Sequence, residues 1–369
     1  MTEREARIAF NLMPDIGAVK VARLAAEAGG SVAEAYARFP VRRDWEGKEP
    51  EWEREIARAA KMKVTILTEL DEAYPPLLRE IASPPLALYV AGDPTVLSRA
   101  GVALVGTRAA TAYGRETAER LAAALAQRGW AVFSGLAAGI DAAAHRGALL
   151  GGGVTAGILG GALDRFFPHE NRALAREMVE KGGCVASEFP FGRRPDAQTF
   201  PQRNRVVSGL ACGVVAVECP LRSGTLITCS RAAEQGRPVM AVPGRVDWKS
   251  AEGCNRLIRE GARLVTCADD VIEELTPLCA PKAKGASPQE RRTPPKSREA
   301  RAAVPFAPPQ PPVSLEESLV LRAIPGNGAT IDAIGREAKL PAAKVNALLV
   351  GLRLKGRVRF LPGNRVTLA

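Results

Sequence analysis

The sequence predicts an α/β protein built on a doubly wound, mostly parallel sheet, with a small helical domain before it and a winged helix after it. Between residues 101 and 244, six short apolar runs each end at Gly, Ser, Thr or Arg residues and lead into a helical pattern. Unbroken apolar runs are typical of strands buried on both faces, which a parallel sheet covered by helices requires. A proline-rich stretch then separates this region from a last segment with three helical patterns and a hairpin.

Residues 1–63 are expected to form a small helical domain of the SAM or helix-hairpin-helix kind. Helical patterns cover residues 6–13, 19–28, 32–38 and 51–62. Residues 12–18 resemble half of a helix-hairpin-helix, in which a glycine hairpin offers backbone N–H groups to a DNA phosphate. Asp15 stands where that motif usually has glycine, and its carboxylate would repel phosphate. A structural role is therefore favoured over a DNA contact.

Residues 64–275 are expected to form the Rossmann-like core. Two strands, at 64–67 and 86–90, lead into the six apolar runs at 102–105, 131–133, 154–159, 184–186, 214–217 and 239–242, and a strand at 263–266 and a helix at 268–275 close the domain. Right-handed crossovers place the carboxyl ends of the parallel strands on one edge, where loops and helix N-termini offer free N–H groups. In open α/β sheets that edge is where ligands bind.

A linker and a winged helix follow the core. Residues 276–313 contain ten prolines and few large apolar side chains, so they cannot bury enough surface to offset their ordering entropy. Residues 314–369 show helical patterns at 315–324, 330–338 and 342–354, and strands at 357–361 and 365–368 flank a turn at 362–364. Three helices and a hairpin predict a winged helix. Its third helix would bury Val345, Leu348, Leu349 and Leu352 and expose Lys344 and Arg353. Whether this domain grips DNA or a protein stays open.

Charge, hydropathy and cysteine content narrow the function classes. The net charge is +11, and nearly all of it lies in residues 276–369, which suggests a polyanionic partner, nucleic acid first; ordinary solubilising charge is the alternative. No apolar stretch is long enough for a membrane span and the start has no signal-peptide pattern, so a cytoplasmic protein without membrane contact is expected. The seven cysteines form no CxxC pair; they are interpreted as structural thiols, with no metal site and no cofactor.

The loops after the first two core strands predict a phosphate site. Gly106 and Thr107 let a phosphate approach the backbone, and Arg108 can meet it with a planar, charged fork. Ser134, Gly135 and Gly139 form a second tight turn, and Asp141 can cap the helix that follows. The GxGxxG spacing of dinucleotide-binding proteins is absent. Tight turns without a ligand are the alternative.

Two further segments complete the expected site. Phe200, Arg203, Asn204 and Arg205 combine a stacking ring with two guanidinium groups that could clamp successive phosphates; solvated surface arginines are the alternative. Ser223, Gly224 and Thr225 open a helix and present N–H groups and hydroxyls to an anion.

No catalytic constellation is visible. His145 lies one helical turn beyond Asp141, where a structural histidine is favoured over a base, and Glu188 and Glu218 at two strand ends could form a carboxylate pair. We therefore assign no catalytic residue.

Taken together, these motifs closely resemble the DNA processing protein A (Smf) family of bacterial single-strand DNA binders. The resemblance runs in unbroken order over roughly residues 70–265. Its residues are Tyr74-Pro75, Val105 to Arg108, Ser134 to Ala137, Gly139 to Asp141, His145, Phe167-Pro168, Asn171, Ser187-Glu188, Phe200-Pro201, Arg203 to Arg205, Ser223 to Thr228, Gly236 to Pro238, Ala241 to Gly244, Gly253, Leu257-Ile258 and Gly261-Ala262. The resemblance implies a non-catalytic protein that binds and shields single-stranded DNA, helps load RecA recombinase during natural transformation, and forms a homodimer through its core. Residues 106–108 and 203–205 are then expected to line the DNA pocket.

Two other functions stay open. One is a nucleotide-cleaving hydrolase of the related lysine-decarboxylase-like Rossmann group. Ser223, Gly224 and Thr225 with Glu234 partly match the phosphate-binding turn and the glutamate of that group, although its double-glycine turn is missing. The other is a regulator that holds a small phosphorylated effector on the core and DNA on the winged helix.

Overall fold

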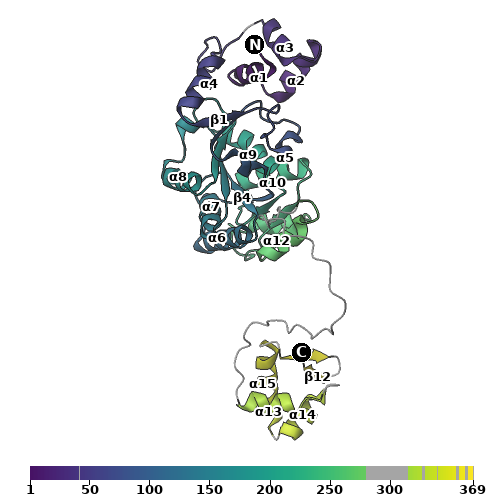
Figure 1. The fold of residues 1–369 in the computed structure, drawn as a ribbon. Helices are drawn as coiled ribbons and strands as arrows, with labels where there is room; N and C mark the ends of the chain where they lie inside the picture. Colours follow the sequence, from purple (N-terminus) through teal and green to yellow (C-terminus); the bar gives the residue numbers. More distant parts are fainter. Residues whose placement is uncertain are drawn as a thin grey trace, which may run out of the picture. The chain divides into compact units, whose positions relative to one another are not determined.

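The computed structural model describes residues 1–40, 42–279, 315–325, 329–338, 340–354, 357–361 and 365–368 (Figure 1). These residues belong to two compact units, one within Met1–Gln289 and the other within Glu290–Ala369. Of the expected linker at 276–313, only residues 276–279 are described, and the expected turn at 362–364 lies outside the described residues.

Four helices precede the sheet and gather at the purple end of the chain in Figure 1. They are α1 (Glu3–Asn11), α2 (Ala18–Glu27), α3 (Val32–Arg38) and α4 (Trp52–Lys61). A capping box begins α1, since the Thr2 side chain accepts the N–H of Glu5 while the Glu5 carboxylate accepts the N–H of Thr2. Phe10 packs edge-on against Tyr36, with ring centroids 5.1 Å apart. The helices predicted for this segment are confirmed, and they belong to the same compact unit as the sheet.

The described part of the first unit contains a nine-stranded sheet in the order β1-β2-β6-β5-β4-β3-β7-β8-β9. Its strands are β1 (Val64–Leu67), β2 (Leu88–Gly92), β3 (Gly101–Val105), β4 (Ala131–Ser134), β5 (Thr155–Ile158), β6 (Cys184–Ser187), β7 (Gly213–Ala216), β8 (Val239–Ala241) and β9 (Arg263–Leu264). The pairs β1–β2 and β2–β6 are antiparallel, and all other neighbours are parallel. Every residue of the strands from β3 to β7 is buried, as the apolar runs predict.

The strand order reverses beside β3. From β3 the chain winds outward through β4, β5 and β6, then crosses back and continues from β7 through β8 to β9. This doubly wound topology confirms the predicted fold class and creates a switch point between β3 and β7. Ligands of such sheets bind at the switch point, outside the carboxyl ends of the strands.

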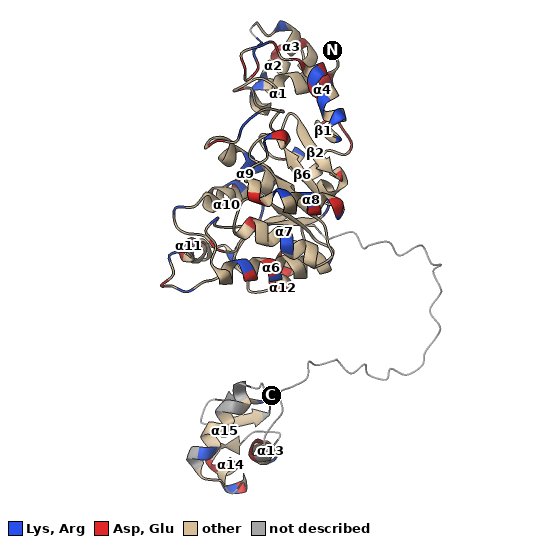
Figure 2. Cartoon of the chain, turned by 90° about the vertical axis from the view of Figure 1, so that its left-hand side faces the viewer, with Lys and Arg blue, Asp and Glu red and all other residues tan. Residues whose placement is uncertain are grey.

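Helices cover both faces of the sheet. On one face lie α6 (Ala112–Gln127), α7 (Ile140–Leu150), α8 (Arg172–Glu180) and α12 (Ala268–Leu275), and on the other lie α5 (Pro76–Arg79), α9 (Thr199–Leu210), α10 (Gly224–Glu234) and α11 (Glu252–Arg259). Figure 2 views the unit from the side of α7 and α8. Successive residues of β3 serve the two layers in turn, because Val102 and Leu104 pack with α6 while Ala103 and Val105 pack with α9.

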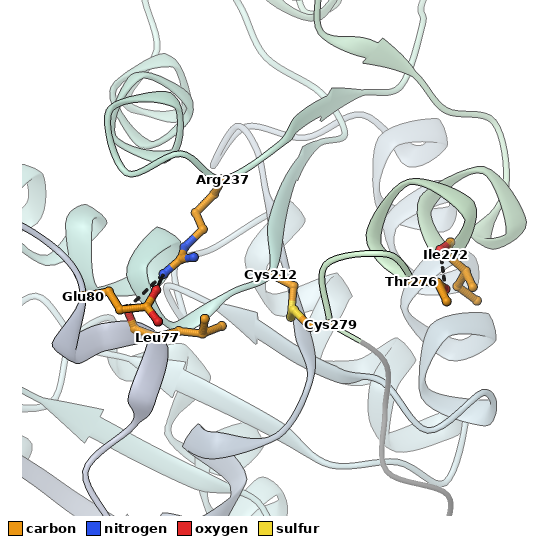
Figure 3. The surroundings of a disulfide bond; sticks show 7 residues. All are labelled: Leu77, Glu80, Cys212, Arg237, Ile272, Thr276 and Cys279. Carbon is orange, nitrogen blue, oxygen red and sulfur yellow. Dashed lines mark hydrogen bonds and ion pairs between the residues drawn. A yellow bond between two sulfur atoms is a disulfide. The ribbon is translucent and has the colours of Figure 1, made fainter.

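A disulfide corrects the interpretation of the cysteines as thiols. Cys212, just before β7, is bonded to Cys279, which follows α12 (Figure 3). The two residues are 67 positions apart in the chain, and α12 folds back so that their Cα atoms lie 6.3 Å apart. Spacing alone could not reveal the pair because only the tertiary fold brings them together. The thiols of Cys184, Cys219, Cys229 and Cys254 are free and buried, as expected, and the thiol of Cys267 is free and exposed.

The described residues of the second unit have the elements of the predicted winged helix. They are α13 (Leu315–Arg322), β10 (Ala329–Thr330), α14 (Ile331–Ala338), α15 (Ala342–Leu354), β11 (Val358–Leu361) and β12 (Arg365–Leu368), with strand order β10-β12-β11. Val345, Leu349 and Leu352 of α15 are buried as expected. The two-residue strand β10 is an addition to the prediction. No helix among the described residues of either unit has the length and apolarity that a membrane crossing requires.

Candidate nucleic-acid interface

A cavity of about 460 Å³ lies at the switch point, beyond the carboxyl ends of β3 and β4 and against α9 and the start of α10. We call it the switch-point cavity. Its volume falls within the usual range of ligand sites. Most of the predicted site residues line it: Gly106, Thr107, Arg108, Gly135, Phe200, Arg203, Asn204, Ser223, Gly224 and Thr225. Ser134, Gly139 and Arg205 do not.

The loop after β3 is held against the end of β7. Thr107 donates its backbone N–H to the carbonyl of Glu218 at 2.7 Å, and the Glu218 carboxylate accepts the N–H of Thr111, the N-cap of α6, at 2.9 Å. A Cβ on Gly106 would lie 2.4 Å from Ile140 Cγ1, so only glycine lets the loop pass so close to α7. These contacts fix the backbone from which Arg108 projects.

Arg108 is an exposed cation of the cavity. Its side chain is exposed and makes no hydrogen bond or ion pair with any described residue. Its guanidinium carbon lies 4.7 Å from the ring centroid of Phe200, a cation–π contact that joins the β3 loop to α9. The Phe200 ring is in turn 6.3 Å from that of Phe167. Charge and an aromatic face therefore lie side by side, although the cation is Arg108 and not the predicted Arg203 or Arg205.

Arg203, by contrast, is built into the cavity wall. Only 4% of its surface is exposed, and its guanidinium donates to the carbonyls of Gly135 and Ile158. Burial lowers the pKa of Arg203 to about 10; Asp141 opposes this shift and Arg108 adds to it. The group stays charged near neutral pH, so its positive field reaches the cavity, although one terminal nitrogen already donates to two carbonyls.

The turn after β4 is closed by its own side chains. The Asp141 carboxylate accepts the N–H groups of Gly135 at 3.1 Å and Ala137 at 3.4 Å, which occupies amides that were expected to meet a phosphate. Burial raises the pKa of Asp141, while Arg203 and these hydrogen bonds oppose the rise. Ser134 is buried and donates its hydroxyl to the carbonyl of Leu104. This turn therefore shapes the cavity floor and leaves the anion contacts to other groups.

Gly139 also has a structural place. It is the residue before α7, has a φ of 78° and lies against the carbonyl of Thr107, where a Cβ would approach to 2.3 Å. Glycine is required there for both reasons.

The N-terminus of α10 faces the cavity. Ser223 caps this helix by accepting the N–H of Thr225 at 3.2 Å, and the Asn204 side-chain amide lies 3.4 Å from the carbonyl of Gly224. Positive dipole ends of helices favour anions. Arg222, which sequence reasoning missed, precedes the cap, lines the cavity and is exposed without a hydrogen bond or ion pair to another described residue. A basic residue directly before a Ser-Gly-Thr helix start was the signal that could have revealed it.

Arg205 lies on another side of α9. Its guanidinium donates to the carbonyl of Ser83 at 2.6 Å and pairs with the Glu188 carboxylate. Residues two apart on a helix point in different directions, so Arg203 and Arg205 do not face one strand of phosphates together. The expected clamp of two adjacent guanidinium groups is corrected accordingly. Arg205 instead lines a second cavity, of about 360 Å³, between α9 and the turn that joins α1 to α2.

The candidate catalytic groups are separated and engaged elsewhere. His145 is fully buried, its Nδ1 lies 2.6 Å from the hydroxyl of Thr155, and burial, with Arg203 and Arg146, lowers its pKa to about 3. Glu218 holds the start of α6 and Glu188 holds Arg205, so they form no pair. Within the described parts of the chain, no group of three or more His, Cys, Asp and Glu residues could hold a metal ion.

Two family models match the chain. The model of DNA recombination-mediator protein A matches residues 65–276, and that of the DprA winged helix domain matches residues 304–364. The chain is 36% identical to Protein Smf of Escherichia coli over 69% of this chain and 64% of that protein. It is 42% identical to DNA processing protein DprA of Streptococcus pneumoniae over 56% of this chain and 72% of that one.

Solved structures show the same likeness. The S. pneumoniae DNA processing protein A covers 74% of this chain and 98% of its own, with 33% identity and a TM-score of 0.61. The Helicobacter pylori protein, whose structure is described as giving insights into its single-stranded DNA binding mode, covers 58% of this chain and 96% of its own, with 28% identity and a TM-score of 0.53.

Proposed function

The chain belongs to the DNA recombination-mediator protein A family, a family of DNA-processing proteins, and we propose that it binds single-stranded DNA at the switch-point cavity. The observation that carries the proposal is the exposed, unpaired guanidinium of Arg108 stacked on Phe200 inside this cavity. A sugar-phosphate strand needs that combination, since the phosphate takes the charge and a neighbouring base takes the ring face.

The charge of the cavity supports a phosphate ligand. Arg108, Arg203 and Arg222 line it against a single carboxylate, Asp141, which is already engaged by backbone amides. The dipole of α10 adds to this positive field. The two exposed arginines, Arg108 and Arg222, provide the direct contacts with phosphate. The buried Arg203 is fixed in the cavity wall and contributes positive potential.

The aromatic contact favours single strands over duplex. A base can stack on the Phe200 ring only when its own partner base has been removed, and such stacking is worth about 1 to 3 kcal/mol per base. In a duplex the bases are paired and stacked on each other, so only the phosphate contacts remain.

The hydrolase alternative has less support. Glu234, the carboxylate on which it depends, lies at the last position of α10, pairs with Arg231 and does not line the cavity. We propose a binding role without catalysis. Release of free base on incubation with a labelled nucleotide would instead support the hydrolase.

The finer parts of the role are also proposals. We propose that the protein shields single-stranded DNA in the cytoplasm and promotes loading of RecA in natural transformation or recombination. We further propose that it acts as a homodimer. Strand β9 supports this, since it lies at the edge of the sheet and Leu264 on it is 47% exposed. Sedimentation of the full chain and the rate of RecA filament formation on coated single strands test these two points.

The central experiment compares one labelled oligonucleotide as a single strand and as a duplex. Fluorescence anisotropy should give tighter binding to the single strand, and Phe200→Leu should weaken that binding by roughly fivefold or more while leaving duplex binding nearly unchanged. Equal affinity for both forms, or a Phe200→Leu protein that binds as well as the wild type, would refute the proposal.

A further inference from the structure

Helix α9 has a cavity on each side. Phe200, Arg203 and Asn204 line the switch-point cavity, while Gln198, Gln202 and Arg205 line the second one, which we call the junction cavity. Figures 1 and 2 both place α9 between the N-terminal helices and α10. The helix is therefore a shared wall, and Gln202, which is exposed, lies on its outer surface.

From this arrangement we infer that the junction cavity is a nucleobase pocket, which receives a base of the strand whose phosphates lie in the switch-point cavity. The inference rests on the proposed function. It adds a second DNA-contact region, which the N-terminal helices and the core form together. The turn between α1 and α2 would then contact the DNA.

The charge balance of the two cavities differs in the required way. The switch-point cavity has three arginines and one aspartate, whereas the junction cavity has Arg193 and Arg205 against Asp15 and Glu188. A phosphate is drawn to the first and gains nothing from the second. A neutral, polar, flat group such as a base is suited to the second.

The lining of the junction cavity offers the groups that bases use. The side-chain amides of Gln198 and Gln202 make no hydrogen bond with any described residue, and an amide can both donate to and accept from a base edge. Trp45 contributes an indole that is 43% exposed, with the Arg193 guanidinium 4.3 Å from its ring centroid. An indole with a stacked guanidinium is a platform on which a base can lie.

The wall of the junction cavity also contains unsatisfied groups. Glu188 Oε1 and Arg193 Nε are buried and have no hydrogen-bond partner among the described residues. Buried polar atoms are almost always paired in native proteins, so these two mark a wall whose hydrogen bonding is incomplete without a ligand or water. Both residues line the junction cavity.

The test uses the full chain and labelled oligodeoxynucleotides of about three to about twelve residues. The short ones fit the switch-point cavity alone, and the long ones can also cross α9. Gln202→Ala and Trp45→Leu should each leave the affinity for the short ones unchanged and weaken that for the long ones by about fivefold or more. Gln127→Ala, an exposed glutamine at the end of α6 on the opposite face, is the matched control and should change neither.

Arg108→Ala separates the two proposals, because it should weaken short and long oligonucleotides alike. If it does so while the Gln202 and Trp45 variants bind all lengths as the wild type does, the base pocket is overturned and the proposed function stands. If the wild type binds no single strand, both are overturned. Weakening of short and long alike by Gln202→Ala would also overturn the pocket.

Tryptophan fluorescence tests the position of Trp45 at the DNA independently of the binding affinity. Long oligonucleotides should quench indole fluorescence more than short oligonucleotides do, both in the wild type and in Gln127→Ala. In Trp45→Phe this difference between long and short oligonucleotides should disappear. Short oligonucleotides should give the same quenching in all three proteins. The same quenching in Trp45→Phe as in the wild type would overturn the inference.

Discussion

Replacing Arg108 by alanine tests the phosphate contact most directly. The guanidinium is exposed, stacks on Phe200 and makes no hydrogen bond or ion pair with a described residue, so its loss should change the stability of the fold by no more than about 1 kcal/mol. Any large effect on binding therefore reports the DNA contact. Arg108→Lys keeps the charge and removes the planar fork, which separates charge from geometry.

The magnitude follows from the number of exposed cations in the switch-point cavity. Each phosphate contact with a single strand contributes about −0.7 to the slope of log affinity against log salt. Arg108 and Arg222 should together give a slope of about −1.4, and Arg108→Ala should reduce it to about −0.7. Between about 50 and 200 mM salt, that difference is roughly a 2.6-fold change in relative affinity.

Fluorescence anisotropy of a labelled single strand, titrated at four or more salt concentrations, measures the slope. Arg108→Lys should keep the wild-type slope, with weaker binding throughout. Arg176→Ala is the matched control: it removes one exposed arginine from α8, on the face of the sheet opposite α9. Identical slopes for the wild type and Arg108→Ala, or an equal flattening by Arg176→Ala, would refute the assignment of Arg108 to a phosphate.

Three further outcomes concern stability. Gly106→Ala should destabilise the protein by about 1 to 3 kcal/mol in urea titrations because the new methyl group meets Ile140, whereas Gly224→Ala, with nothing within 4 Å, should change stability by less than about 0.5 kcal/mol; equal effects would contradict the close approach. Arg203→Met should cost about 3 to 5 kcal/mol, since it leaves two buried carbonyls without their donor and removes the positive charge that stabilises the buried Asp141 carboxylate, and a variant as stable as the wild type would contradict that role. Because the pKa of His145 is lowered from 6.5 to about 3, the unfolded chain takes up a proton below pH 6.5 that the native protein does not. The wild type should therefore lose up to about 1.4 kcal/mol of stability per pH unit below 6.5 relative to His145→Gln, and parallel pH curves for the two proteins would contradict this.

Much of the fold could be predicted because burial on both faces leaves a plain pattern. The runs at 102–105 and 214–217 differ from β3 and β7 by one residue at most at each end, and the helix predicted at 342–354 has the bounds of α15. In these segments, apolar residues suit both the local strand or helix conformation and the buried environment, so the sequence pattern alone identifies the element. The order of strands and the antiparallel edge formed by β1 and β2 depend on contacts between distant segments, which no local pattern records.

The candidate site was predictable in its loops and less so in its side chains. Gly106, Thr107 and Arg108 follow a buried strand, so their place at the carboxyl edge of the sheet follows from topology. The burial of Arg203 could not be predicted, because it depends on carbonyls of β5 and of the residue after β4 that only the folded sheet brings to α9. The orientation of Arg205 could have been, since two positions along a helix turn a side chain to another face.

The bond between Cys212 and Cys279 has a mechanical consequence. The backbone N–H of Cys212 donates to the carbonyl of Gly101, so this residue is already anchored between β3 and β7 at the centre of the sheet. Tension applied to the chain beyond residue 279, as when the winged helix is held by a partner, is thus transmitted through the sulfur atoms to the middle of the sheet. Helix α12 is spared the load and should stay docked, whereas a chain in which the sulfurs are reduced would let it peel away first.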